Sequence, residues 1–414
     1  MKKAGLILLT LALGCTFMCG YQGPCGPMEP DKEAIHWRDS LNGYLTNALS
    51  TLPEMDAVVD SFMNFWSLRG VSLAVMRNDS LLYAHGYGKA DASTPMTPGT
   101  TLRLASVSKL LTAIGIMRLQ EKGLVYLDTP VFGPFGVLKR YDSYIKDEDY
   151  YLITVEHLLR HQAGFTSRGG DPVFSPYSSR EALLQKQLGR RLAYEPGTSQ
   201  EYSNLGFLLL SLIIEEVSGK PYEQFMQEEV FSPALCRGFR LAGNYLADRH
   251  PGETRYYMHP EATLTASFDG RYAAVEKCYG GNDVRGSLGA GGWTGSAAEL
   301  ARMVACIDGH GPLEDILVPF SVRQMTDYYD ADTFSLGWND TKPTGEWTRS
   351  GSFSGTQALV KTFPDGECWV FIANTSTWRG SRFAKNIAAL FENLRSRFSS
   401  DLPVRDLFRV PAGQ

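Results

Sequence analysis

Ser106 and Lys109 are the two residues in this sequence whose types and spacing most clearly suggest chemistry. They lie near the start of residues 104–120, a segment that is predicted to form an amphipathic helix. Residues three apart share one face of a helix, so the hydroxyl and the amine can meet. The positions that follow are apolar enough to be core: Leu110, Leu111, Ile114, Met117 and Leu119. Burial lowers the pKa of a lysine, and a neutral amine can take the proton of a serine, so the pair predicts a serine nucleophile.

The same pair also has a purely structural interpretation. A serine three residues before a lysine occurs often by chance, so Ser106 could simply cap a helix while Lys109 stays solvated. The apolar run after Lys109 argues against solvation of its amine. A helix start would also place backbone N–H groups and the positive end of the helix dipole near Ser106. Both features favour the chemical interpretation.

A second group, Tyr202-Ser203-Asn204, follows a turn at Pro196-Gly197 and precedes an apolar segment. The hydroxyl of Tyr202 could relay a proton, and the amide of Asn204 could orient Lys109 or a substrate carbonyl. The alternative is a tyrosine packed under the turn and an asparagine that caps the next helix. The residues alone leave both interpretations open.

A third group lies in residues 347–355, directly before a predicted strand. Arg349, Ser350 and Gly351 can lay a cation, a hydroxyl and a small residue along the edge of a substrate. The alternative is a loop rich in glycine and serine that carries a surface arginine.

The elements that must position these groups form three blocks. Apolar periodicity predicts a helix over 54–67 and then a hairpin of residues 71–76 and 81–87. A matching hairpin and a closing helix lie near the end of the chain: 357–363, 368–374 and 381–397. Strand signals are sparse between the blocks, where four helices are predicted: 154–164, 181–192, 204–217 and 221–231.

The predicted fold class is α/β combined with an all-α part. An antiparallel sheet flanked by the N- and C-terminal helices carries a mostly helical inserted domain. Residues 53–398 are predicted to form one domain, in which 53–122 and 283–398 build the sheet-and-helix part and 123–282 the insertion. Residues 399–414 are interpreted as a C-terminal tail.

The N-terminus predicts export. Residues 1–15 combine a basic start with an apolar run too short to span a membrane, as a signal peptide does. Gly14-Cys15 resembles a bacterial lipoprotein cleavage site, so Cys15 is a candidate for lipid attachment to a membrane. Residues 16–52 are interpreted as a tether. The expected location is the periplasm or cell envelope, or otherwise the medium, where four cysteines could pair: Cys236, Cys278, Cys306 and Cys368.

Composition and charge exclude several classes of protein. The chain has 414 residues, of which 43% are hydrophobic and 21% charged, so it is neither disordered nor fibrous. A net charge of -5 gives no basic field, so nucleic acid is not an expected partner. His157 and His161 have the spacing of zinc ligands, but Leu158 stands where the hydrolytic pattern needs glutamate. A metallohydrolase is therefore only a rival hypothesis, and no metal or cofactor is expected.

Taken together, the three groups and their flanking phrases resemble the serine β-lactamase and D-alanyl-D-alanine carboxypeptidase superfamily. The resemblance is greatest to class C β-lactamases and related esterases, and it runs in order from about Met55 to Leu394. The phrases that carry it are Leu104-Ala-Ser-Val-Ser-Lys109, Leu158-Leu-Arg-His-Gln-Ala-Gly164, Glu195-Pro-Gly197, Tyr202-Ser-Asn204, Gly289-Ala-Gly-Gly292 and Phe363-Pro-Asp365.

The resemblance implies a role for each residue of the site. Ser106 would be the nucleophile and Lys109 the base, or its partner in taking the serine proton. Tyr202 would complete the proton relay to the leaving group, and Asn204 would help to hold the substrate. Backbone N–H groups of Ser106 and Ser352 would form the oxyanion hole.

The third group departs from the family pattern, in which Lys or His is followed by Thr or Ser and then Gly. This chain has Arg349-Ser350-Gly351, with an arginine that stays charged and is a poor proton shuttle. Arg349 is suited to bind a carboxylate, and its charge would lower the pKa of Lys109 if the two lie close. A substrate that bears a carboxylate is therefore plausible.

The function predicted from the sequence is that of an exported serine hydrolase. It would attack an amide or ester carbonyl of a small molecule or peptide and pass through an acyl-enzyme at Ser106. Within the fold, a β-lactamase or carboxypeptidase and a small-ester hydrolase remain alternatives. A catalytically silent module that binds penicillin or peptidoglycan is a rival from another class.

Overall fold

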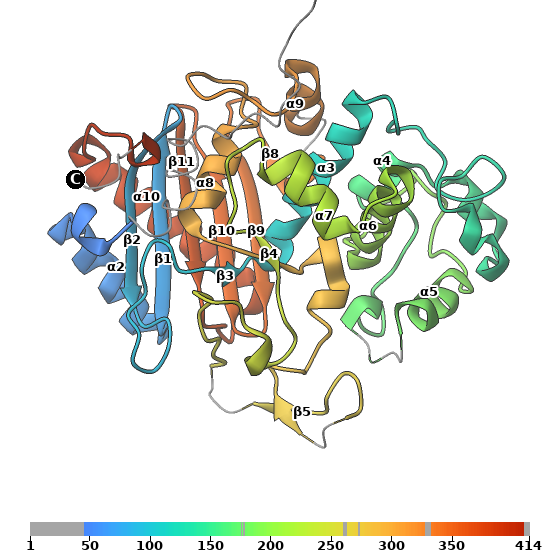
Figure 1. Cartoon of the computed structure of the whole chain (residues 1–414), viewed down its shortest axis with the longest axis horizontal. Helices are drawn as coiled ribbons and strands as arrows, with labels where there is room; N and C mark the ends of the chain where they lie inside the picture. Colours follow the sequence, from blue (N-terminus) through green and yellow to red (C-terminus); the bar gives the residue numbers. More distant parts are fainter. Residues whose placement is uncertain are drawn as a thin grey trace, which may run out of the picture.

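Six strands form one sheet in the computed structural model, and every neighbouring pair is antiparallel (Figure 1). Their order is β2-β1-β11-β10-β9-β8. The strands are β1 (Gly70–Arg77), β2 (Ser80–Gly88), β8 (Asp340–Thr341), β9 (Trp347–Phe353), β10 (Thr356–Thr362) and β11 (Glu367–Ala373). The first and last thirds of the chain therefore complete one sheet, as the sequence predicts.

The structure describes residues 45–174, 176, 179–259, 263–271, 274–327 and 333–409. The predicted signal peptide, Cys15 and most of the predicted tether lie outside these residues. None of the helices in the described part has the length and apolar character needed to cross a membrane. The four cysteines proposed for pairing, Cys236, Cys278, Cys306 and Cys368, are all buried and free.

Both predicted hairpins are present. β1 and β2 are joined at Asn78 and Asp79, which both have positive φ, the conformation that matches the twist of two strands joined by a two-residue turn. Successive side chains of β1 point to opposite faces of the sheet. Val71, Leu73 and Val75 therefore lie in a different core cluster from Ala74 and Met76.

Helices cover both faces of the sheet. On one face, α2 (Pro53–Trp66) and α10 (Ala384–Phe398) pack against Leu73, Val75 and their neighbours, which confirms the predicted first and closing helices. The other face carries α8 (Ala297–Ala305) and the larger core cluster. α9 (Pro319–Thr326) lies beyond the end of α3 (Ser108–Glu121) in Figure 1.

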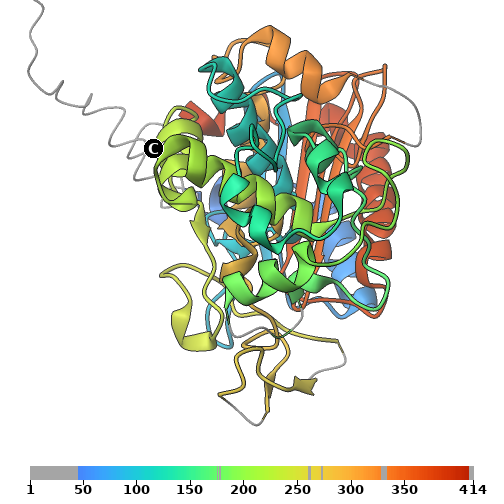
Figure 2. The same cartoon turned by 90° about the vertical axis from the view of Figure 1, so that its right-hand side faces the viewer.

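The inserted region is mostly helical and lies to one side of the sheet (Figures 1 and 2). Its helices are α4 (Val155–Leu159), α5 (Arg180–Leu188), α6 (Asn204–Ser218) and α7 (Tyr222–Met226), the last continued by a π-helical turn, Gln227–Phe231. The region also contains the short strands β4 (Arg240–Leu241), β5 (Leu264–Thr265) and β6 (Val275–Glu276). β4 joins β3 (Leu102–Arg103) and β7 (Trp293–Gly295), which lie outside the insertion in sequence, in a three-stranded sheet. α6 ends at Ser218, and Gly219 caps it in the left-handed conformation that glycine adopts readily.

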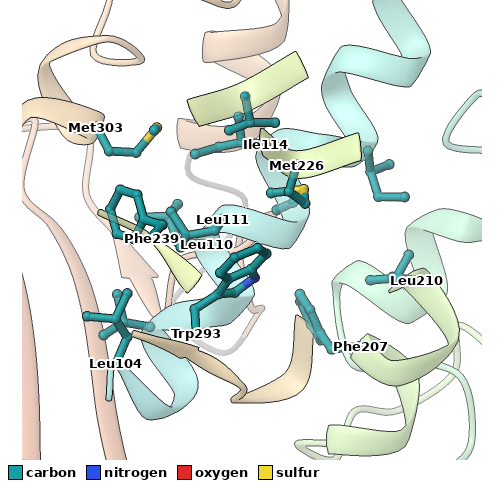
Figure 3. Packing of buried hydrophobic residues seen from close by; sticks show 14 of the residues in the cluster. Leu104, Leu110, Leu111, Ile114, Phe207, Leu210, Met226, Phe239, Trp293 and Met303 are labelled. Carbon is teal, nitrogen blue, oxygen red and sulfur yellow. The ribbon is translucent and has the colours of Figure 1, made fainter. Parts of the chain in front are cut away.

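The helix α3 differs from its prediction. It is not amphipathic, because 11 of its 14 residues are buried. The helix lies between the sheet and the helical insertion, and Figure 3 shows Leu110 and Leu111 among Phe239 and Trp293. Because the hydrophobic core surrounds α3, the side chain of Lys109 in its first turn is removed from water.

The packed unit extends past the predicted domain boundaries at both ends. Before α2, the side chain of Asn47 donates to the carbonyl of Gly86 in β2 at 2.7 Å. After α10, Leu407 and Phe408 are buried, and Arg405 donates to the carbonyl of Leu82 at 2.9 Å. Residues 45–52 and 399–409 thus cover the outer strand of the sheet.

Candidate active site

Ser106 lies in a tight 3₁₀ turn, Ala105–Val107, directly before α3. The prediction placed it in the first turn of the helix itself. Ala105 has a φ of 49°, in the left-handed region that a residue with a Cβ atom rarely adopts. Strain of this kind is often found at functional sites. Ser106 still stands three residues before Lys109, and its side chain lines the pocket beside the Lys109 amine.

Lys109 is fully buried, and its amine has three hydrogen-bond acceptors. Nζ donates to Ser106 Oγ at 3.2 Å, to Asn204 Oδ1 at 2.6 Å and to the carbonyl oxygen of Ala290. The pKa of Lys109 is lowered to about 8, chiefly by burial, and the nearby charge of Arg349 acts in the same direction. The amine of Lys109 is therefore desolvated and lies within hydrogen-bonding reach of the serine hydroxyl.

Tyr202 completes the group around the nucleophile. Its hydroxyl donates to Ser106 Oγ at 2.7 Å, and its ring centre lies 4.9 Å from Lys109 Nζ. Burial alone would raise the pKa of this phenol, but the cations of Lys109 and Arg349 lower it below its usual value. Tyr202 is thus not merely packed beneath a turn, because its hydroxyl is part of the site.

Asn204 is the first residue of α6, but it does not cap that helix. The cap is Ser203, whose hydroxyl accepts from the N–H of Gly206 at 3.1 Å. Asn204 is left free for the site, where Oδ1 accepts from Lys109 and Nδ2 donates to Asp171 Oδ2 at 2.6 Å. No sequence pattern marks Asp171, which is a lone aspartate in a loop after two glycines.

Arg349 does not occupy the position expected of a residue that binds a substrate carboxylate. It is completely buried, and its Nε donates to the carbonyl of Ser106 at 2.8 Å. The reason is that residues 347–355 contain a strand, β9, rather than the glycine- and serine-rich loop considered as an alternative. Side chains alternate along a strand, so Arg349 points inward whereas Ser350 and Ser352 line the pocket. The expected contact of Arg349 with a substrate carboxylate stays a prediction, and the burial of this side chain argues against it.

Gly351 lets β9 approach the turn of the nucleophile. A Cβ atom at this position would lie 2.3 Å from the carbonyl oxygen of Leu104 and 3.1 Å from the backbone nitrogen of Ser106. Only glycine tolerates such an approach. The predicted position of Gly351 in the site is thus explained by its lack of a side chain.

The N–H of Ser352 points away from β10. The N–H and hydroxyl of Ser350 both donate to Asn339 Oδ1, at 2.7 and 3.1 Å, so the N–H of Ser350 points away from β10. Backbone N–H groups two residues apart in a strand share one edge. The N–H of Ser352 therefore points to the same edge of β9 as that of Ser350, and Ser352 lines the pocket together with Ser106.

These residues surround a pocket of about 420 Å³. It is lined by Ala105, Ser106, Phe174, Tyr202, Asn204, Ala290, Gly291, Asn339, Ser350, Ser352, Phe353 and Ser381. Phe174 and Phe353 pack together with ring centres 5.1 Å apart. No lysine, arginine or carboxylate belongs to this described lining.

The two histidines considered as zinc ligands have other partners. His157 Nδ1 accepts from the backbone N–H of Thr154 in a capping box at the start of α4. His161 Nδ1 accepts from the N–H of Ser203 at 3.0 Å, and burial lowers the pKa of this imidazole well below its usual value. Within the described residues, no group of three or more His, Cys, Asp or Glu side chains is arranged to hold a metal ion.

Comparisons with known proteins agree with this geometry. A model of the family described as Beta-lactamase matches residues 55–393. Penicillin-binding protein 4* of Bacillus subtilis is 31% identical over 187 residues, which are 43% of this chain and only 39% of that protein. Esterase EstB of Burkholderia gladioli is 26% identical over 314 residues, covering 70% of this chain and 79% of the esterase.

Solved structures share the fold. The D-amino acid amidase of Ochrobactrum anthropi SV3, complexed with D-phenylalanine, superposes with a TM-score of 0.66 at 20% sequence identity. The match covers 83% of this chain and 98% of the amidase. The family model spans most of the chain, and the fold and the serine-centred group agree with it, so this protein is a serine hydrolase that belongs to the Beta-lactamase family.

Proposed function

We propose that this protein hydrolyses amide or ester bonds of small molecules through an acyl-enzyme at Ser106. The observation that carries the proposal is that Ser106 Oγ receives hydrogen bonds from both Lys109 Nζ and Tyr202 OH. Two titratable groups on one hydroxyl can take its proton and later return it. A silent binding module would have no need for a buried lysine beside a serine.

The proposed reaction begins when the Lys109–Tyr202 pair accepts the proton of Ser106. Oγ then forms a bond to the substrate carbonyl carbon, and the bond to the leaving nitrogen or oxygen breaks as Tyr202 returns a proton to that atom. Water hydrolyses the ester formed at Ser106 and releases the acid. The lowered pKa of Lys109 and that of Tyr202 both favour the form of the pair that has lost a proton.

The backbone N–H groups of Ser106 and Ser352 are the proposed oxyanion hole. The direction of the Ser352 N–H along the edge of β9 supports this role, as does the close approach that Gly351 allows. Loss of one such donor typically lowers turnover about 10²–10³-fold.

An uncharged substrate fits the pocket better than a carboxylate. The described lining is polar without being charged, and Phe174 and Phe353 offer an apolar wall to an acyl group. Arg349 is buried behind the nucleophile, where a substrate carboxylate does not reach it. A small-ester or amide hydrolase is therefore favoured over a carboxypeptidase, in line with the activities named for the esterase and the amidase among the relatives.

Export is proposed on the sequence of residues 1–15 alone. The full chain would be found in the cell envelope, held by lipid on Cys15, and Cys15→Ser would release it to the soluble periplasmic fraction. Fractionation of bacteria that produce both forms tests this proposal. An uncut N-terminus in the cytoplasmic fraction would contradict it.

Hydrolysis of a matched substrate panel tests the proposed activity. p-Nitrophenyl esters, D-amino acid p-nitroanilides, and acyl peptides with a free or an amidated C-terminus would be offered to the wild type and to Ser106→Ala. We expect turnover of an ester or amide that the variant loses and that a chelator leaves unchanged. Turnover that survives in Ser106→Ala, or none with any substrate, would sink the proposal.

A further inference from the structure

Asp171 lies at the far end of a chain of hydrogen bonds that leads to the nucleophile. Its carboxylate accepts from Asn204 Nδ2 at 2.6 Å, Asn204 Oδ1 accepts from Lys109 Nζ at 2.6 Å, and Lys109 donates to Ser106 at 3.2 Å. Asp171 does not belong to the described pocket lining, and Asn204 and Lys109 connect it to the serine.

The chemistry of the four groups fixes the direction of this chain. An ionised carboxylate only accepts hydrogen bonds, so Asp171 can hold the asparagine amide by its NH₂ side alone. The carbonyl side of Asn204 must then face Lys109, where it accepts from the amine. Without Asp171 the amide could turn over and present its NH₂ group to the amine, which is a clash of donors.

The loop that carries Asp171 is built to hold it in place. Gly169 and Gly170 both have positive φ, 89° and 111°, so the chain turns sharply just before the aspartate. The second carboxylate oxygen, Oδ1, accepts from the N–H of Val173 at 2.9 Å and closes a short turn. One carboxylate oxygen thus shapes the loop while the other contacts Asn204.

We propose that Asp171 is a positioning residue that holds the Asn204 amide so that its carbonyl orients the Lys109 amine toward Ser106. This inference rests on the proposed acyl-enzyme function of Ser106. It adds a residue that none of the recognised motifs contains and that does not belong to the described pocket lining. The negative charge of Asp171 also raises the pKa of Lys109, which gives the role a signature in the pH profile.

A double-mutant cycle tests the proposal with a p-nitrophenyl ester that the wild type hydrolyses. Loss of a hydrogen bond to a charged group should lower kcat in Asp171→Ala by about 10- to 100-fold, with little change in KM. In the background of Asn204→Ala, the same substitution should have almost no further effect, because its target is gone. Effects that multiply in the double variant would overturn the proposal.

Two further variants separate positioning from loosening of the loop. Asp171→Asn keeps an acceptor but removes the charge, so kcat on the alkaline plateau should stay near that of the wild type while the acid limb moves to lower pH. Thr166→Ala is the control, because Thr166 anchors the same loop to Glu201 at 3.0 Å without contacting Asn204. An identical loss in Thr166→Ala, or an unmoved acid limb in Asp171→Asn, would contradict the role of Asp171.

Failure of the proposed role of Asp171 can be distinguished from failure of the proposed acyl-enzyme function. If Ser106→Ala keeps the esterase activity, the acyl-enzyme itself is wrong. If Ser106→Ala is inactive but Asp171→Ala retains full kcat and an unchanged pH profile, the acyl-enzyme stands and only the role of Asp171 is wrong.

Discussion

The hydroxyl of Tyr202 donates a hydrogen bond of 2.7 Å to Ser106 Oγ, although 96 residues separate the two in the chain. The turn before α3 provides the serine, and the segment before α6 provides the tyrosine. Because α3 and α6 pack against each other, their N-terminal ends bring the two hydroxyls together. The proposed proton transfer from Ser106 depends on this contact.

Tyr202→Phe removes only the hydroxyl and should leave the fold intact. We expect kcat/KM to fall by about 10²–10⁴-fold, the usual range for loss of a group that transfers protons. Steady-state kinetics with an ester substrate measure the effect, and a thermal melt checks folding. Activity within a few-fold of the wild type in a folded variant would remove Tyr202 from the relay.

The rate should rise with pH through an apparent pKa near 8, the value to which burial lowers the pKa of Lys109. Below that pH the amine is protonated and cannot accept a proton, and above it the neutral form prevails. Since Lys109 and Tyr202 interact, the midpoint belongs to the pair. A profile of kcat/KM between about pH 5 and about pH 10 tests the sign, and a fall through this region would contradict it.

Gly351→Ala should impair both folding and catalysis. The new methyl group would lie 2.3 Å from the carbonyl oxygen of Leu104, so the strand or the nucleophile turn must shift. We expect a loss of about 1–3 kcal/mol in the free energy of unfolding and of about 10²–10³-fold in kcat. Gly311→Ala is the matched control, because a Cβ atom there meets nothing within 4 Å. If both variants lost the same stability and the same kcat, the close approach of β9 to the nucleophile turn would be unimportant.

Arg349→Met tests whether the arginine acts through the pKa of Lys109 or binds a substrate carboxylate. Removing this buried cation should raise the apparent pKa of the acid limb, because its charge lowers the pKa of Lys109. The losses should be the same for a substrate with a free carboxylate and for its amide. A selective loss with the carboxylate would instead restore the direct contact that its burial argues against.

Much of the site could be predicted because its residues have the types and the spacing of the family motifs. Ser106 and Lys109 stand three apart, and Tyr202 and Asn204 two apart, so short phrases identify them. The sheet and its two flanking helices could also be predicted, since the hairpins have clear turns and the helices clear apolar periodicity.

The parts that could not be predicted depend on tertiary packing. α3 is apolar on most sides because it lies between the sheet and α6, which the pattern of one segment does not reveal. Because the segment 347–355 is rich in glycine and serine, its sequence did not indicate the strand β9. The inward direction of Arg349 could therefore not be predicted either. Asp171 acts through a loop contact with Asn204, so no local pattern marks it.

Covalent labelling tests directly whether the hydroxyl of Ser106 is an activated nucleophile. The wild type would be treated with a fluorophosphonate, and the modified peptide would be identified by mass spectrometry beside Ser106→Ala. We predict one adduct on Ser106 in the wild type and none in the folded variant. Labelling of Ser106→Ala to the same extent, or a wild type that stays unlabelled, would contradict an activated nucleophile at Ser106.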